Sequence, residues 1–432
     1  MVRFLHLSDV HLGFNRYGSA ERTKDFYLAL DDVIERYAIA AQVDFVLIAG
    51  DLFEDRQILP ATLNQAKLCL QKLQDAAIPV FAIEGNHDNC PYGTQTSWLR
   101  YLSSWDYLVL LEPYDGESGP EYEPWDPESH SGGYVDLPCG VRIIGSRWYG
   151  ASAPQMIRKI AEAIAALPPG PDKTIMMFHH GLEGQIARYN GALRYQELLP
   201  LREAGVDYLA LGHIHRHYEK EGWIFNPGSL EANSIVENQA QNPRGVLLVE
   251  MDETGIRADL RRDYYQRPIR RLIFKTEKQM TSDDLAAGAI AQIEAAAQRG
   301  ETQGALVEMV IQGQTGFNRV DLNLKTLRDR LKTLSGALIL LLKYEAVGTE
   351  YRTPALAGTG NAPTRAQIEQ QVFLDLLTAN TRYETHAPRL AAGLTDLKDR
   401  VLDNQAEDTL YEFVQDLLDT LETPQASGSL GA

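Results

Sequence analysis

Five short motifs rich in histidine and carboxylate side chains recur along the first half of this 432-residue chain. Each follows an apolar run of strand length, and they read Asp9-Val10-His11, Gly50-Asp51, Gly85-Asn86-His87-Asp88, His179-His180 and Gly212-His213-Ile214-His215. In open α/β sheets, ligands bind outside the carboxyl ends of the strands. We therefore expect these side chains to converge on one crevice and to form a metal site there.

The types of donor group limit which ions such a crevice binds. Imidazole, carboxylate and carboxamide groups suit Mn, Fe or Zn, and the set contains no thiolate of the kind that builds a structural zinc cage. The candidate ligands are Asp9, His11, Asp51, Asn86, His179, His213 and His215. This is more than one ion usually needs, and it fits two ions that share one bridging carboxylate. The surplus positive charge would attract a phosphodiester and acidify a bound water.

The segments between the motifs alternate strand-like and helix-like patterns. Strands are predicted over 3–7, 45–49, 80–83, 174–178 and 208–211, and apolar stripes predict helices over 26–37 and 63–73. This alternation indicates sheets covered by helices. A lone histidine at a strand end is more often packed or solvated than a ligand, so the metal site rests on the joint occurrence of the motifs.

Taken together, the motifs resemble those of the calcineurin-like dimetal phosphoesterase superfamily. Within it they are most similar to the SbcD nucleases, the bacterial counterparts of the meiotic-recombination-eleven nuclease. The matching segments are Asp9–Gly13, Gly50–Phe53, Gly85–Asp88, His179 and Gly212–His215, followed by a Pro-Gly-Ser element at Pro227–Ser229. The resemblance is strongest over residues 1–232. It implies a layered α/β fold, a calcineurin-like β-sandwich flanked by helices, with a small α/β capping domain and a C-terminal helical segment that binds a partner.

The resemblance also implies a role for each matching residue. The first ion would be held by Asp9, His11 and His215, the second by Asn86, His179 and His213, and Asp51 would bridge both. His87 would protonate or stabilise the leaving 3′-oxygen, and Asp88 would fix its tautomer through a hydrogen bond. The family commonly has glutamine after the ligand histidine, so the metal is assigned to His179 rather than His180. The implied cofactor is two divalent ions, Mn²⁺ first, with Mg²⁺, Fe²⁺ or Zn²⁺ as alternatives.

One position departs from the family pattern. Archaeal members place a second histidine directly after Gly-Asp-Leu-Phe, where this chain has Glu54. A carboxylate there can orient water or hold His87, but it supplies no proton at neutral pH unless its pKa is strongly raised.

Other polar residues have plainer interpretations. His6 lies inside the first strand and is expected to be packed, while His130, His217 and His386 are expected to be structural or solvated. The Gly228-Ser229 pair is either a simple turn or a phosphate contact through Ser229.

Composition limits the class of protein. A chain of 432 residues, 44% of them hydrophobic, predicts two or three domains with sizeable cores. The cysteines at 69, 90 and 139 are odd in number and lack metal spacing, so no disulfide framework is expected. The N-terminus runs directly into the first strand, and no apolar run is long enough to span a bilayer. We expect a cytoplasmic, nucleoid-associated enzyme with no membrane partner.

The formal net charge of −18 is unusual for a protein that binds DNA, because Lys and Arg normally neutralise the phosphates. Much of the acid lies in residues 112–128 and in the C-terminal region. The densest basic run contains the predicted DNA contacts Arg262, Arg267, Arg270 and Arg271. An equally open interpretation is a solvated strand pair with outward charges.

Beyond a nuclease domain predicted over residues 1–255, the pattern alternates again. Strands over 269–276, 305–312 and 337–345 and helices over 283–298 and 322–334 predict a small domain over 256–347. By resemblance, it caps the site and contacts DNA. A flexible linker is predicted over 348–363 and a disordered tail over 423–432.

Two amphipathic stretches, 365–379 and 408–421, form a predicted helical segment over 364–422. Short helices on a tether cannot bury such apolar faces alone, so either a partner covers them or they pack on the chain itself. By resemblance, the partner is an SbcC-like SMC-family ATPase. The family also implies a homodimer, through helices near 63–73 and 96–102.

These observations predict an Mn-dependent exonuclease and endonuclease for double- and single-stranded DNA, acting in double-strand break and hairpin processing. The alternative is a small-molecule or cyclic-nucleotide phosphodiesterase of the same superfamily. A non-enzymatic scaffold for an ATPase is disfavoured by the intact ligand set.

Overall fold

The computed structural model describes residues 1–91, 93–94, 96–185, 192–238, 242–317, 319–348, 364–378, 386–403 and 405–422. The predicted linker, apart from Gly348, and the predicted tail lie outside the described residues. Contacts divide the chain into two units. The first is Met1–Arg271 with Ala297–Glu308 and Ser335–Leu341, and the second is Leu272–Ala296 with Met309–Leu334 and Leu342–Ala432. The domain boundaries predicted at residues 255 and 347 stay predictions.

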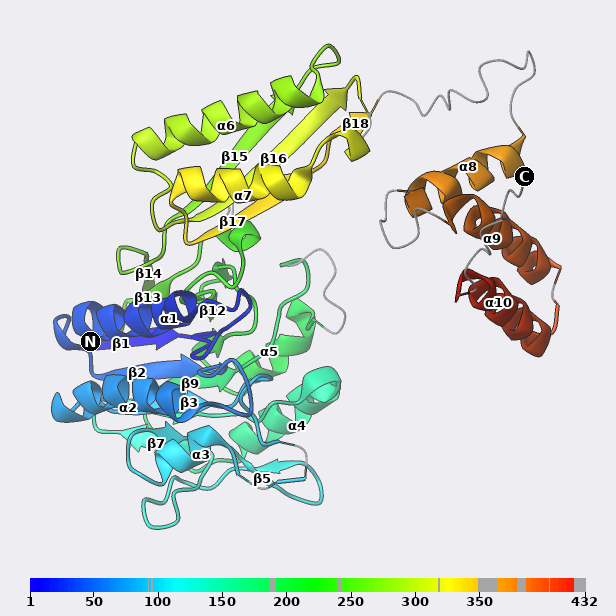
Figure 1. Cartoon of the computed structure of the whole chain (residues 1–432). Helices are drawn as coiled ribbons and strands as arrows, with labels where there is room; N and C mark the ends of the chain where they lie inside the picture. Colours follow the sequence, from blue (N-terminus) through cyan, green and yellow to red (C-terminus); the bar gives the residue numbers. More distant parts are fainter. Residues whose placement is uncertain are drawn as a thin grey trace, which may run out of the picture. The chain divides into compact units, whose positions relative to one another are not determined.

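Two six-stranded sheets dominate the first unit (Figure 1). The first has the order β14-β13-β1-β2-β3-β4, with β1 Val2–Leu7, β2 Phe45–Ala49, β3 Val80–Ile83, β4 Val109–Leu110, β13 Val246–Asp252 and β14 Gly255–Arg261. The second has the order β11-β12-β10-β9-β8-β7, with β7 Tyr134–Leu137, β8 Val141–Ile144, β9 Lys173–Phe178, β10 Tyr208–Leu211, β11 Tyr218–Lys220 and β12 Ile224–Asn226. A small hairpin pairs β5 Tyr114–Asp115 with β6 Pro120–Glu121.

Alternation along the strands assembles the sheets into a sandwich, because successive side chains point to opposite faces. In β1, Phe4 joins a core that includes residues of both sheets, among them Ile175 and Tyr208. Its neighbour Leu5 joins a separate core with α1 and α2 residues. The sequence therefore gives a four-layer α–β–β–α unit, as the predicted fold class requires.

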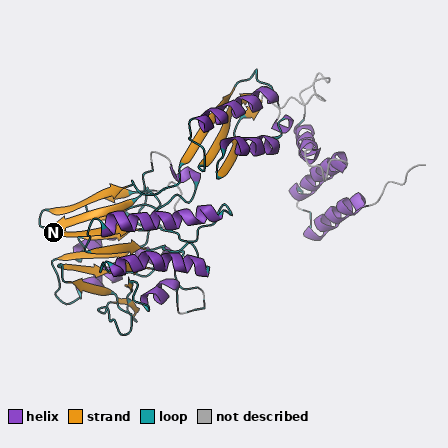
Figure 2. Cartoon of the chain, turned by 60° about the vertical axis from the view of Figure 1, so that its left-hand side comes forward, coloured by secondary structure: helices purple, strands orange, loops and turns teal. Residues whose placement is uncertain are grey.

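Helices cover both outer faces of this sandwich (Figure 2). They are α1 Ala20–Val33, which continues as a π-helix over Ile34–Ile39, α2 Pro60–Asp75, α3 Trp98–Ser103, α4 Ala153–Ala165 and α5 Tyr195–Glu203. The Ser19 hydroxyl caps α1 by accepting from Arg22 N, and Pro60 begins α2, where its missing N–H leaves no bond unmade.

The register of the central strands decides where the motifs lie. Leu7 pairs with Ile48 and Ala49 with Ile83 in parallel strands of the first sheet, while Phe178 pairs with Leu211 in the second. Parallel strands end at the same edge, so the residues that follow β1, β2 and β3 emerge together. Those that follow β9 and β10 likewise emerge together.

A third sheet has the order β15-β16-β17, with β18 paired to β16. Its elements are β15 Ile269–Thr276, β16 Leu306–Thr315, β17 Ile339–Tyr344, β18 Val347–Gly348, α6 Ser282–Gln298 and α7 Leu324–Ser335. The predicted strands and helices of this region are confirmed, with ends shifted by a few residues. No described helix of the chain is both long and apolar enough to cross a membrane.

The C-terminal segment holds three helices: α8 Arg365–Thr378, α9 Ala387–Leu402 and α10 Glu407–Glu422. The sequence prediction had missed α9, which carries a proline in its first turn and a glycine in its interior. That glycine, Gly393, lies against Leu417 of α10, and Arg400 covers the Phe413 ring at 4.2 Å. The helices therefore bury part of their apolar faces on one another, in line with the alternative that they pack on the chain itself.

A buried ion network joins α1 to two distant segments of the first unit. Arg22 is fully buried, and it contacts Asp25 at 2.9 Å and Glu231 at 3.4 Å. Arg267 binds Asp25 through two nitrogens at 2.5 Å each, and Arg244 contacts Glu231 at 3.3 Å. Because each buried charge has an opposite partner, the network ties α1 to the chain that follows β12 and to the chain that precedes β15.

Replacing Arg22 by Met should lower the free energy of unfolding by roughly 1.5–3 kcal/mol, because Asp25 and Glu231 each lose one buried cation but keep Arg267 and Arg244. Arg36→Met is the matched control. Arg36 is 55% exposed beside Asp32, so its loss should cost less than about 1 kcal/mol. Urea unfolding monitored by circular dichroism measures both, and equal losses in the two variants would contradict a structural role for the network.

Candidate metal centre

The seven predicted ligands lie in two adjacent groups at the strand ends. Asp9 and His11 follow β1, Asp51 follows β2 and Asn86 follows β3, all in the first sheet. His179 follows β9, and His213 and His215 follow β10, both in the second sheet. Each group combines residues from both sheets.

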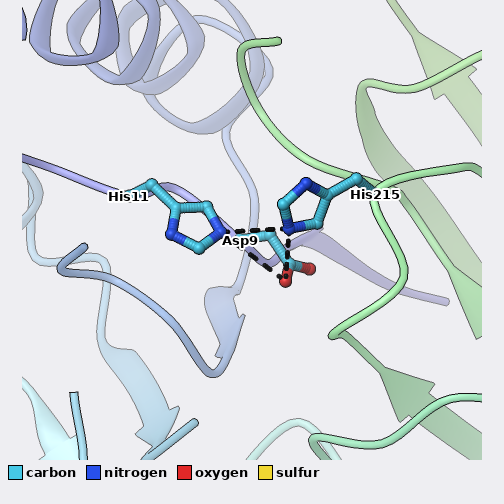
Figure 3. A group of neighbouring side chains, drawn as sticks. All are labelled: Asp9, His11 and His215. Carbon is cyan, nitrogen blue, oxygen red and sulfur yellow. Dashed lines mark hydrogen bonds and ion pairs between the residues drawn. The ribbon is translucent and has the colours of Figure 1, made fainter. Parts of the chain in front are cut away.

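The first group consists of Asp9, His11 and His215 (Figure 3). The Nε2 atoms of the two histidines are 3.1 Å apart. Asp9 Oδ1 lies 3.6 Å from His215 Nε2 and 4.0 Å from His11 Nε2. Three donor atoms therefore face one small space, with the Asp9 carboxylate fully buried beneath it.

The second group consists of Asp51, His179 and His213, with Asn86 among them. His179 Nε2 lies 3.1 Å from Asp51 Oδ2 and 3.2 Å from Asn86 Oδ1. The same Asn86 oxygen is 2.7 Å from His213 Nδ1. Nitrogen and oxygen donors converge here too, and the donor chemistry of both groups fits divalent ions such as Mn, Fe or Zn.

The backbone beneath these ligands is strained. Asp9, His11, Asp51 and His213 have φ values of 51°, 54°, 53° and 76°, in the left-handed region. Such backbone costs about 1–3 kcal/mol per residue and concentrates at functional sites. It is held by the main chain, since Asp9 N donates to Gly50 O at 3.1 Å and His11 N to Asp51 O at 3.1 Å.

Two glycines of the motifs are required by close approach. A Cβ on Gly85 would lie 2.1 Å from Asp51 Oδ1. A Cβ on Gly50, where φ is +89°, would lie 2.3 Å from His179 Nδ1. Gly50 precedes the ligand Asp51, and Gly85 precedes the ligand Asn86. Each glycine leaves room for a ligand side chain that comes from the end of another strand.

The cluster is electrostatically coupled. Burial opposes protonation of His179, but the Asp51 carboxylate outweighs it and raises the pKa of His179 to about 9. Burial would raise the pKa of Asp51, yet His179 holds that pKa below its usual value. Burial also opposes protonation of His215, but Glu237 and Asp9 raise its pKa to about 9. Burial, then the charge on His179, lowers the pKa of His213 to about 3.

His87 and Asp88 have partners other than each other. His87 Nδ1 lies 2.7 Å from the Glu54 carbonyl oxygen, and the His87 ring is 4.9 Å from that of His11. Asp88 accepts from Gly85 N at 2.8 Å and Leu52 N at 2.7 Å. The prediction that Asp88 fixes the His87 tautomer is therefore wrong, because the buried Asp88 carboxylate joins two loops and a main-chain carbonyl orients the ring.

Of the five predicted DNA contacts, Ser229 is buried and two arginines are held by internal ion pairs. Ser229 is fully buried, which removes its hydroxyl from direct contact with DNA. Arg267 is held by Asp25, as described above, and Arg271 contacts the buried Glu308 at 3.0 Å. Arg262 and Arg270 are exposed, and neither forms an ion pair with a carboxylate in the described part of the chain. The assignment of Arg262 and Arg270 to DNA stays a prediction.

Three residues near the cluster were not among the predicted ligands. Glu54 Oε2 lies 2.8 Å from His11 Nδ1, and Glu237 Oε1 lies 3.5 Å from His215 Nδ1. The Trp148 ring is 5.7 Å from His179 and 5.3 Å from His213. Glu54 was visible in the sequence as a departure from the family pattern, whereas no sequence motif marks Glu237 or Trp148.

Comparison with known proteins agrees with this geometry. The sequence profile of the calcineurin-like phosphoesterases matches residues 2–217. The DNA double-strand break repair protein Mre11 of Archaeoglobus fulgidus is 31% identical over 248 residues, covering 55% of this chain and 52% of that protein. That of Saccharolobus solfataricus is 30% identical over 220 residues, covering 50% of each. The chain thus spans about half the length of these curated relatives. A family 1 β-glucosidase structure from Thermotoga maritima aligns at 11% identity with a TM-score of only 0.19, covering 79% of this chain and 83% of that one.

Mn²⁺ binding should strengthen as the pH rises from about 6.5 toward 9, because His179 and His215 must each lose a proton to become ligands. Below a pH of about 9 both imidazoles are mostly protonated, so protons compete with the metal for their nitrogens. Calorimetric titrations in two buffers of different ionisation enthalpy should show about two protons released at pH 7 and fewer at pH 9. Affinity that does not change over this range would contradict the assignment of these two ligands.

Proposed function

The chain belongs to the calcineurin-like phosphoesterase family, and on that premise we propose that it is a metal-dependent DNA nuclease acting in double-strand break and hairpin processing. The observation that carries the proposal is the pair of adjacent ligand groups, each built from both sheets. Two similar proteins are named for DNA double-strand break repair, which supports DNA as the substrate. Both exonuclease and endonuclease activity on double- and single-stranded DNA are included.

The ligand assignment follows the two groups. Asp9, His11 and His215 would hold the first ion, Asn86, His179 and His213 would hold the second, and Asp51 would be the carboxylate shared by both. When bound, two divalent ions supply positive charge for the phosphate and make a water acidic enough to attack phosphorus. The protein prepares this by burying the Asp9 and Asp51 carboxylates, whose charge is then available to the ions and not to bulk water.

His87 is the residue assigned to the leaving 3′-oxygen. With Nδ1 donating to the Glu54 carbonyl, the imidazolium form of the ring carries its second proton on Nε2, and this proton would pass to the leaving oxygen. His87 and Asn86 line a cavity of about 560 Å³, which provides space for a nucleotide beside the ligands. The bond between phosphorus and the 3′-oxygen breaks as the attacking oxygen bonds to phosphorus from the opposite side.

Other parts of the chain support larger assemblies. Exposed apolar side chains on α2 and α3 and at the end of α3, Leu68, Tyr101 and Trp105, suit the predicted homodimer. We assign residues 1–255 to the nuclease domain and 256–347 to the capping domain, with Arg262 and Arg270 as its DNA contacts. Residues 364–422 are assigned to the binding of an SbcC-like ATPase. We take Mn²⁺ as the ion and the cytoplasmic nucleoid as the place of action.

The rival function is hydrolysis of small phosphodiesters. Cleavage of labelled hairpin DNA should be compared with cleavage of bis(p-nitrophenyl) phosphate, first with Mn²⁺ and then with Mg²⁺. The nuclease proposal expects efficient Mn²⁺-dependent cutting of the hairpin at nanomolar protein. Turnover of the small diester with no cutting of DNA would favour the rival.

His87→Ser should retain both ions and DNA affinity while cleavage slows by about a hundred- to ten-thousand-fold, the usual worth of general acid–base help. Asp51→Asn is the contrasting variant, because it removes the anion shared by both ions and should lose metal and activity together. Elemental analysis for Mn and single-turnover cleavage measure the two effects. Loss of an ion from His87→Ser would instead make His87 a ligand.

The ATPase should bind the stripe of α8 that remains exposed. Ile368 and Leu376 are 48% and 66% exposed on one face of α8, whereas Leu417 and Phe413 of α10 pack against α9. Ile368→Glu with Leu376→Glu should abolish co-purification with an SbcC-like partner and leave basal cleavage of short DNA unchanged, because each charge would be desolvated in the complex. Tyr114→Glu, on an exposed position of β5 outside residues 364–422, is the control, and unchanged partner binding in the double variant would place the interface elsewhere.

A further inference from the structure

The two ring nitrogens of His11 face different groups. Nε2 points to the other members of the first ligand group, 3.1 Å from His215 Nε2 and 4.0 Å from Asp9 Oδ1. Nδ1 points the other way, 2.8 Å from Glu54 Oε2. The His11 side chain is fully buried, so no bulk water competes for either nitrogen. The two atoms are not aligned as a hydrogen bond, so Glu54 acts through its charge, which favours the tautomer with hydrogen on Nδ1 and leaves the Nε2 lone pair for a metal.

His215 repeats this arrangement from the opposite sheet. Its Nε2 faces Asp9 Oδ1 at 3.6 Å, and its Nδ1 faces Glu237 Oε1 at 3.5 Å. Glu237 is itself fixed, since its other oxygen accepts from Asn233 N at 2.8 Å. Both histidines of the first group are thus backed by a glutamate on the side away from the ligand space.

The second group lacks this pattern at its buried histidine. His179 Nδ1 lies 2.7 Å from the carbonyl oxygen of Ala49, a neutral partner. The group also holds a neutral carboxamide, Asn86, between its histidines. The carboxylates close to the first group are Asp9, Glu54 and Glu237, whereas those at the second group are Asp51 and, bound to main-chain amides beside it, Asp88.

We propose that Glu54 and Glu237 are positioning residues that hold His11 and His215 for the first ion and make its site the tighter of the two. This inference rests on the proposed two-ion centre. A carboxylate behind a ligand imidazole orients the ring and raises its basicity, and losing such a partner typically weakens metal affinity by 10–100-fold. The metal-free protein therefore fills in two steps, the Asp9–His11–His215 site first.

Glu54 acts on two residues through separate groups. Its carboxylate faces His11, while its main-chain carbonyl accepts from His87. A change of the Glu54 side chain leaves that carbonyl in place, so it tests the contact to the ligand without removing the contact to His87. Glu54→Gln keeps an acceptor for His11 and removes the charge, and Glu54→Leu removes both.

The test is calorimetric titration of metal-free protein with MnCl₂, using the wild type, Glu54→Gln, Glu54→Leu, Glu237→Gln and the Glu54→Gln/Glu237→Gln double variant. The control is Glu183→Gln, which removes one negative charge from a 64% exposed side chain paired with Arg194. The wild type should bind two Mn²⁺ in resolved steps. Each Gln variant should weaken the first step by about 10-fold, Glu54→Leu by about 100-fold, and the control by less than about twofold.

If the glutamate positions the imidazole, Glu54→Leu should weaken the first step more than Glu54→Gln does. Loss of charge alone would weaken that step equally in both variants. Mn²⁺ electron paramagnetic resonance at one equivalent should show a mononuclear spectrum in the wild type and more unbound Mn²⁺ in the variants. Circular dichroism checks that each metal-free variant is folded. If Glu54→Leu is unfolded, the Mn²⁺ affinities of the Gln variants alone provide the test. An unchanged first step, losses equal to that of Glu183→Gln, or weakening of the second step alone would overturn the proposal.

No DNA is present in this titration, so its outcome separates from that of the nuclease. A wild type that binds two Mn²⁺ in the expected order but leaves DNA uncut would refute the nuclease and retain the role of the glutamates. Unchanged variants beside a wild type that cuts DNA would refute the role of the glutamates alone. A wild type that binds no Mn²⁺ would refute both.

Discussion

The arrangement of the strand-end cluster depends on two carboxylates that are almost completely buried, those of Asp9 and Asp51. Buried charge is stable only when it is paired or coordinates a metal. Here the pairing groups are imidazoles drawn from a second sheet. Bringing these groups within bonding distance requires left-handed backbone at the ligands and glycines at positions where a Cβ would not fit.

The sandwich is suited to this task because each ligand group draws on both sheets. The first combines residues that follow β1 with one that follows β10, and the second combines residues that follow β2 and β3 with others that follow β9 and β10. Ions bound there would join the sheets at the open end of the sandwich, so metal binding would also stabilise the fold. The negative net charge of the chain is compatible with a phosphodiester substrate under this account, since the ions themselves supply the local positive charge.

The sequence was informative where local pattern and strand ends decide the outcome. The central strands and the seven candidate ligands could be predicted, because a polar motif directly after a buried strand must emerge at the sheet edge. Contacts between distant residues could not: Arg267 lies 242 residues from Asp25, and nothing near it marks a buried partner. The same holds for Asp88, whose partners are main-chain amides of another loop, and for Glu237, which reaches His215 from outside every motif. Helix α9 was missed because Gly393 interrupts its pattern, and that glycine makes sense only beside Leu417 of α10.

The central claim is that two ions occupy the strand-end cluster, one in each ligand group. Crystals grown with Mn²⁺ and measured at a wavelength near the manganese edge test it directly through anomalous difference density. The account predicts two peaks about 3.5–4 Å apart, the separation usual for two-metal hydrolases, with Asp51 between them. One peak alone at saturating Mn²⁺, or peaks away from the Asp9–His11–His215 and Asp51–His179–His213 groups, would contradict it.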